Sequence, residues 1–147
     1  MTIRNDKNKI NKIYNLFKNN TLFSVDDDLS TDFNIISSTI LITEWSGIAM
    51  EFAFSTNQPV IFIDTPPKIK NKNWKILNID CIEENLRAEL GVIVKPKFMN
   101  NIYNSVIELI DKKNHWNQKI MPIKDKYIYN IGNSSEIALD YVKKTLN

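Results

Sequence analysis

An apolar run, a short polar turn, a helical pattern and a second apolar run follow one another between residues 39 and 64. The runs 39–43 and 60–64 are apolar throughout instead of alternating, which is typical of parallel strands covered on both faces. The turn contains Ser46-Gly47, and Pro59 marks the end of the helical pattern. The sequence therefore predicts a strand–helix–strand unit with a right-handed crossover in an α/β fold.

A helix that begins at Ser46-Gly47 directs free backbone N–H groups beyond the end of the preceding strand, where anions and above all phosphate bind. Glu51 follows Gly47 by four residues, so it should lie one turn further along the same side of the helix. This spacing suits the pyrophosphate and the ribose of a nucleotide. The alternative is that Ser46-Gly47 is an ordinary helix start and that Glu51 is a solvated surface charge.

The rest of the chain continues the alternation of helices and strands. We expect helices at 9–18, 31–38, 82–90, 100–113 and 134–146, and strands at 21–25 and 92–94. Prolines and lysines indicate a loop at 65–73, and Gly91 is expected to end a helix in the left-handed conformation. These elements predict one Rossmann-like domain over residues 1–147, a parallel sheet flanked by helices, with the helices of 100–147 packing on it or crossing from it.

Acidic residues follow three of the predicted strands, namely Asp26, Glu44 and Asp64. Ligands of parallel α/β sheets bind beyond the carboxyl ends of the strands, so these acids are candidates for a polar rim that binds hydroxyl groups. They are also candidates for ordinary helix caps and strand ends. A metal site is a third interpretation, but no histidine supports it.

Composition excludes several classes of protein. A net charge of +2 with scattered basic residues does not indicate a nucleic-acid-binding protein. No apolar run approaches ~18 residues, and the N-terminus lacks the apolar segment of a signal peptide. Cys81 is the only cysteine, which excludes a disulfide framework and a cysteine metal cluster. These features predict a cytoplasmic protein.

The segments 40–54 (ILITEWSGIAMEFAF) and 58–64 (QPVIFID) together resemble the nucleotide-binding half of GT-B glycosyltransferases, most of all the CDP-glycerol glycerophosphotransferase type. Enzymes of this family build teichoic-acid-like and capsular polymers. The family has an acid, an aromatic residue and two small residues before this helix, an acid within it, and an apolar strand led by proline after it. The segment from Asn130 to Tyr141 is also similar to the last Gly- and Ser-containing segment of the family.

The resemblance implies a role for each matching residue. Ser46, Gly47 and the amide of Ile48 would bind the nucleotide diphosphate, and Glu51 would bind the ribose. Glu44 stands where the family usually has aspartate, and Gly47 where it often has serine. These departures leave the base and the head group of the donor open.

Further contacts are implied outside this unit. Ser134 and Ser135 would form a second phosphate contact at the start of the last helix. The remaining implied donor contacts are Glu44, Lys68 and Arg87. We expect no metal and no cofactor, because backbone amides and the helix dipole would stabilise the charge that develops on the leaving diphosphate.

A GT-B enzyme has two Rossmann-like domains with catalysis between them, and 147 residues hold one. The only histidine, His115, is expected near a helix end and away from the strand ends, as a partner of the helix C-terminus and not a general base. The resemblance thus implies the donor-binding half of a transferase, inactive alone, that binds CDP-glycerol or a nucleotide sugar. Its partner would be a missing N-terminal acceptor domain, with peripheral association at the inner face of the membrane through the full enzyme. Two alternatives stay open: a non-catalytic nucleotide- or protein-binding module, and half of a nucleotide-sugar 2-epimerase-like enzyme.

Overall fold

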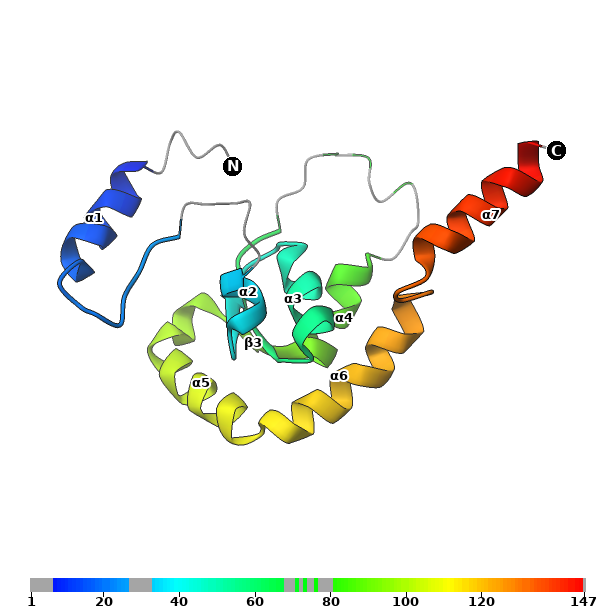
Figure 1. Ribbon diagram of the computed structural model, residues 1–147. Helices are drawn as coiled ribbons and strands as arrows, with labels where there is room; N and C mark the ends of the chain where they lie inside the picture. Colours follow the sequence, from blue (N-terminus) through cyan, green and yellow to red (C-terminus); the bar gives the residue numbers. More distant parts are fainter. Residues whose placement is uncertain are drawn as a thin grey trace. The chain divides into compact units, whose positions relative to one another are not determined.

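The computed structural model describes residues 7–26, 33–67, 71, 73, 76 and 81–146. The chain divides into two compact units, Met1–Asp32 and Phe33–Asn147. Helix α1 (Lys7–Phe17) belongs to the first unit, and the sheet and all other described helices belong to the second (Figure 1). The second unit has the α/β architecture that the strand–helix–strand pattern predicts.

The prediction of a strand at residues 21–25 is wrong, because these residues form a turn and irregular structure. The chain turns directly after α1, where the amide of Asn20 donates to the Phe17 carbonyl and the amide of Phe23 donates to the Asn20 carbonyl. The side-chain oxygen of Asn20 accepts a further hydrogen bond from the Leu22 amide. These local hydrogen bonds occupy the backbone groups that a sheet ladder would need. Asp26 therefore does not follow a strand.

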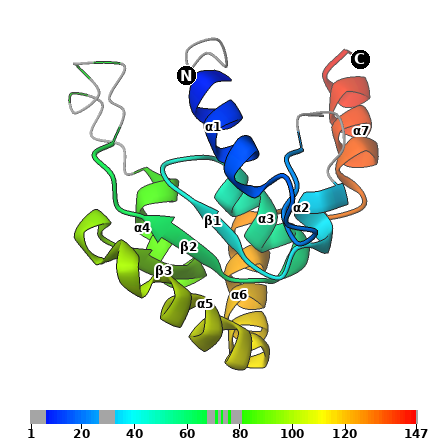
Figure 2. The ribbon, with the colours of Figure 1, turned by 90° about the vertical axis from the view of Figure 1, so that its left-hand side faces the viewer.

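Strands β1 (Leu41–Thr43), β2 (Val60–Ile63) and β3 (Gly91–Val94) form a parallel sheet in that order (Figure 2). Helix α3 (Ile48–Thr56) joins β1 to β2, and α4 (Ile82–Leu90) leads into β3. The left-handed Asn57 ends α3, and its amide donates to the Ala53 carbonyl. The expected parallel α/β class is confirmed, with β1 and β2 close to their expected limits.

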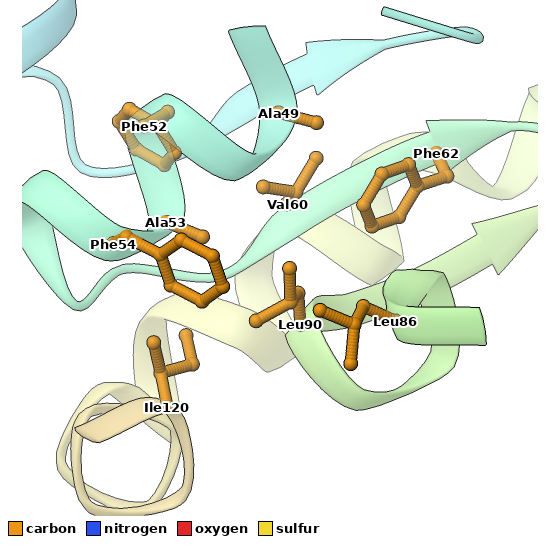
Figure 3. Packing of buried hydrophobic residues seen from close by; sticks show 9 residues of the cluster. All are labelled: Ala49, Phe52, Ala53, Phe54, Val60, Phe62, Leu86, Leu90 and Ile120. Carbon is orange, nitrogen blue, oxygen red and sulfur yellow. The ribbon is translucent and has the colours of Figure 1, made fainter. Parts of the chain in front are cut away.

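Side chains of β2 alternate between two hydrophobic clusters on opposite faces of the sheet. Val60 and Phe62 join one cluster with residues of α3, α4 and α6 (Lys113–Tyr127), which Figure 3 shows. Ile61 and Ile63 join the other, which includes Leu109 of α5 (Ile102–Asp111). Fully burying an aliphatic or aromatic side chain stabilises the fold by about 1.5–3 kcal/mol. This burial on both faces explains why β2 is apolar at successive positions.

The prediction that Gly91 ends a helix in the left-handed conformation is wrong. Gly91 has extended backbone and begins β3. It lies beside Val60 in the sheet, and a Cβ added to Gly91 would collide with the Val60 backbone. The absence of a side chain thus permits close packing of the two strands.

The region after β3 contains a helix that the sequence pattern missed. A 3₁₀ helix, η3 (Pro96–Asn101), leads into α5, and after a break at Lys112 the chain forms α6 (Lys113–Tyr127). Pro122 lies inside α6, where its missing N–H argues against a helix from sequence alone. His115 lies in the first turn of α6, so the prediction that it lies near a helix C-terminus is wrong.

The remaining described helices match their expected positions. They are α2 (Phe33–Ser37) and α7 (Ser134–Leu146). No residue of α7 is buried. Among the described residues, none of the helices has both the length and the apolar character that crossing a membrane requires.

Candidate functional site

Two turns at the carboxyl edge of the sheet are tied to each other by side chains. The indole N–H of Trp45, after β1, donates to the carbonyl of Thr65, after β2, at 2.6 Å. The Thr65 hydroxyl in turn donates to the Glu44 carboxylate at 3.0 Å. Because β1 and β2 are parallel, both turns begin at the same edge. Glu44 is therefore part of the framework of this edge.

Arg87 of α4 reaches the same edge and is only 5% exposed. Its guanidinium donates to the Asp64 carboxylate at 3.2 Å and to the Ile63 carbonyl at 3.4 Å. It also lies over the Trp45 ring, with 3.9 Å between the guanidinium carbon and the ring centroid. A buried cation needs such partners, because leaving water costs several kcal/mol. Asp64 is therefore the counter-charge of Arg87.

Arg87 retains one unused donor. Its Nε is buried and has no hydrogen-bond partner among the described residues. The space around Arg87, Trp45, Glu83 and Ser46 has a volume of only about 10 Å³, close to the minimum for one water molecule. A larger ligand must therefore bind at the exposed rim of this edge, where Ser46 lies.

The rim is the N-terminus of α3. Ser46 and Gly47 are exposed, and no side chain caps the helix. The amides of Ala49 and Met50 donate to the carbonyls of Ser46 and Gly47, whereas those of Gly47 and Ile48 have no partner among the described residues. A Cβ on Gly47 would meet nothing within 4 Å. The geometry thus leaves two donors and open space where the sequence predicts a phosphate.

Glu51 lies one turn further along α3 and lines a hollow of about 490 Å³. The hollow lies between α3 and the end of α6, and its lining is mostly apolar. Its lining residues are Met50, Glu51, Phe54, Ser55, Lys124, Ile128 and Ile131. A mostly apolar hollow with a few polar groups has the character of a small-molecule site. The sequence reading missed Lys124, Ile128 and Ile131, because the unpredicted helix α6 brings them beside Glu51.

The other predicted site residues lie apart from this arrangement. Ser134 and Ser135 are exposed at the start of α7, and the Ser134 hydroxyl donates to the Asn130 carbonyl at 3.2 Å. Neither serine lines the hollow of Glu51 or the small space beside Arg87. Lys68 lies outside the described residues. The structure therefore brings together Glu44, Ser46 and Arg87, with Gly47 and Ile48 adjoining and Glu51 one turn away.

One carboxylate at this end of α4 has a shifted pKa. The Cys81 thiol donates a hydrogen bond to Glu83 at 2.9 Å, and this bond lowers the pKa of Glu83, with a smaller contribution from the backbone amide of Glu83. Within the ranges 7–26, 33–67 and 81–146, no group of three His, Cys, Asp or Glu side chains is arranged to hold a metal ion.

Comparison of the chain with protein-family models, with curated proteins and with solved structures found no match. The resemblance of residues 40–64 to a transferase family therefore depends on those residues alone.

Proposed function

We propose that this chain is the donor-binding half of a transferase that moves glycerol phosphate or a sugar from a nucleotide-activated donor to a cell-surface polymer. In this proposal the sheet of the second unit is one Rossmann-like half of a GT-B fold. The observation that carries it is the pairing of an uncapped helix N-terminus at Gly47 with a hollow that contains Glu51 one turn away. A phosphate fits the first feature, and a ribose with its base fits the second.

The chemistry follows from the position of the free donors. The amides of Gly47 and Ile48 and the positive end of the α3 dipole would bind the diphosphate and stabilise the negative charge that grows on it as the donor bond breaks. Glu51 would accept hydrogen bonds from the ribose hydroxyls, and the apolar wall of the hollow would contact the base. Arg87 would act through Trp45 and Asp64, by holding the two turns of the rim in place.

Calorimetric titration of the full chain with CDP and UDP tests this assignment. Gly47→Val should weaken both nucleotides alike, because its side chain blocks the approach of the anion to the backbone. Glu51→Gln should lower affinity about 10- to 100-fold, the effect of losing one charge-assisted hydrogen bond.

The matched control is a 2′,3′-dideoxy nucleotide. The effect of Glu51→Gln should shrink with this ligand, because the hydroxyls that the carboxylate would bind are already gone. A wild-type chain that binds no nucleotide at millimolar concentration, or a silent Glu51→Gln, would show that the site is assigned wrongly. A non-catalytic module that binds a protein partner would then be the better interpretation.

A further inference from the structure

Two opposite charges line the hollow between α3 and the end of α6. Glu51 lies in the first turn of α3, and Lys124 lies in the last turn of α6. Neither side chain has a hydrogen-bond or ion-pair partner among the residues that the structure describes. The hollow therefore offers a ligand one charged acceptor and one charged donor.

The position of Lys124 is determined by the packing of α6. Ile120, one turn earlier, is fully buried and shares a cluster with Phe54 of α3 (Figure 3). Ile123 and Tyr127 pack against the same cluster. Lys124 itself is half-buried. A lysine in such a place lays its hydrocarbon stem on apolar surface and directs its ammonium group to the polar end, which here is the hollow.

The ammonium group of Lys124 is separate from the position assigned to the diphosphate. Ser46 and Gly47 do not line the hollow, and Lys124 does not line the small space beside Ser46. With the diphosphate at Gly47 and the ribose at Glu51, the base extends from the ribose towards the wall that Lys124 forms with its apolar neighbours. Lys124 is the charged group of that wall.

An ammonium group discriminates between bases because it has three N–H donors and no acceptor. It binds a keto oxygen and is repelled by an exocyclic amino group. At the edge farthest from the ribose, uracil and guanine carry a keto oxygen where cytosine and adenine carry an amino group. Ser55, the remaining polar residue of the lining, does not discriminate, because its hydroxyl both donates and accepts.

We propose that Lys124 is a specificity-determining residue that selects a donor with a keto base, uracil or guanine, over one with cytosine or adenine. This inference rests on the proposed function, because it assigns the base to the hollow that contains Glu51. It favours a nucleotide sugar with a uracil or guanine base over CDP-glycerol. A few polar groups in a mostly apolar site commonly set the orientation and the specificity of the ligand in this way.

Calorimetric titration of the full chain with UDP, CDP, GDP and ADP tests the proposal. UDP should bind about 10- to 100-fold more tightly than CDP, and GDP more tightly than ADP by a similar factor, the effect of one hydrogen bond to a charged group. Lys124→Met, which keeps an unbranched stem, should remove both differences. Lys124→Arg, which also carries only donors, should keep them. Lys126→Met is the matched control and should change nothing, because Lys126 lies over the Tyr127 ring and does not line the hollow.

The outcomes separate this inference from the function on which it rests. Equal wild-type affinities for UDP and CDP would overturn the role of Lys124 and leave nucleotide binding intact. An equal loss for UDP and CDP in Lys124→Met would also overturn it, because the ammonium group would then bind something that both nucleotides share. A wild-type chain that binds none of the four nucleotides would overturn the proposed function together with this inference. The wild-type comparison needs no substitution, and circular dichroism checks that each variant retains the fold.

Discussion

At the scale of single residues, Arg87 links three parts of the carboxyl edge of the sheet. It extends from α4, pairs with Asp64 after β2 and stacks on Trp45 after β1. The guanidinium is suited to this position because its flat, delocalised charge can lie over an aromatic ring while its N–H groups donate hydrogen bonds in the plane of the guanidinium itself. The position of α4 is thereby coupled to the turn that presents Ser46 and Gly47.

Removing the partner of Arg87 should destabilise the fold. Asp64→Ala leaves a cation whose side chain is only 6% exposed without its counter-charge, and we expect a loss of about 2–3 kcal/mol in the free energy of unfolding. This estimate is reduced because the Asp64 side chain is itself 35% exposed. Adding Arg87→Met to Asp64→Ala should recover part of the loss, because no unpaired charge is then buried. Urea denaturation of the two single variants and the double variant measures the coupling, and strictly additive losses would contradict it.

The contribution of Glu83 to folding stability depends on pH. Its folded pKa lies below the ordinary value of 4.5, so its stabilising contribution is present above pH 4.5 and is lost as the pH falls through the lowered pKa. Because the thiol of Cys81 is the main cause, Cys81→Ala should raise the pKa of Glu83 towards its ordinary value. Cys81→Ser, which keeps a donor, should leave the pKa low. NMR titration of the Glu83 carboxyl carbon distinguishes the two, and equal pKa values in both variants would refute the role of the donor.

At the scale of secondary-structure elements, the contact between β2 and β3 depends on the lack of a side chain at Gly91. Gly91→Ala places a methyl group against the Val60 backbone, and overpacking of this kind costs about 1–3 kcal/mol. Gly47→Ala is the matched control, because its methyl group enters open space, and we expect a change within about 1 kcal/mol. Thermal and urea denaturation of both variants provide the measurement. Equal stability of the two variants would mean that β2 and β3 can move apart to accommodate the methyl group without a loss of folding free energy.

Elements with strong local patterns were predictable from the sequence, whereas those decided by tertiary context were not. The apolar runs at 39–43 and 60–64 predicted β1 and β2, because a parallel strand that is buried on both faces is apolar at successive positions. Helix α6 was missed because Pro122 contradicts helix propensity, yet packing of Trp116 and Ile120 in the two clusters outweighs that local cost.

The same distinction applies to the candidate site. The turn at Ser46-Gly47 and the place of Glu51 one turn along α3 follow from local spacing. The pairing of Arg87 with Asp64 joins residues of different elements, and no local pattern encodes it. The lining of the hollow by Lys124, Ile128 and Ile131 depends on α6, so it too was beyond a reading of spacing alone.

At the scale of the whole molecule, the described residues of the second unit form one sheet with helices on both faces, and the candidate site opens at a rim of that sheet. Charge stabilisation by backbone amides at such a rim assists a leaving group but supplies no general base. His115, the only histidine of the chain, lies at the start of α6 and lines neither space described at the site. We therefore expect this chain to bind a nucleotide-activated donor without catalysing transfer from it.

The purified full chain should accordingly fold and bind nucleotide, but should not transfer glycerol phosphate or sugar from CDP-glycerol or a nucleotide sugar. Radiolabelled donor, supplied with a polymer acceptor and the chain alone, provides the measurement. A heat-denatured sample of the same preparation serves as the control. Transfer that exceeds this control would show that the chain carries a complete catalytic site and would contradict its assignment as the donor-binding half.

The order of the strands along the chain has a consequence for how the protein folds. The β1–α3–β2 unit closes over a shorter stretch of chain than the pairing of β2 with β3, and the entropy lost on closure grows with the logarithm of that length. Contacts between distant residues form more slowly for the same reason. We therefore expect refolding to begin with β1, α3 and β2, so that the helix start at Gly47 forms before α4 brings Arg87 to its place against Trp45.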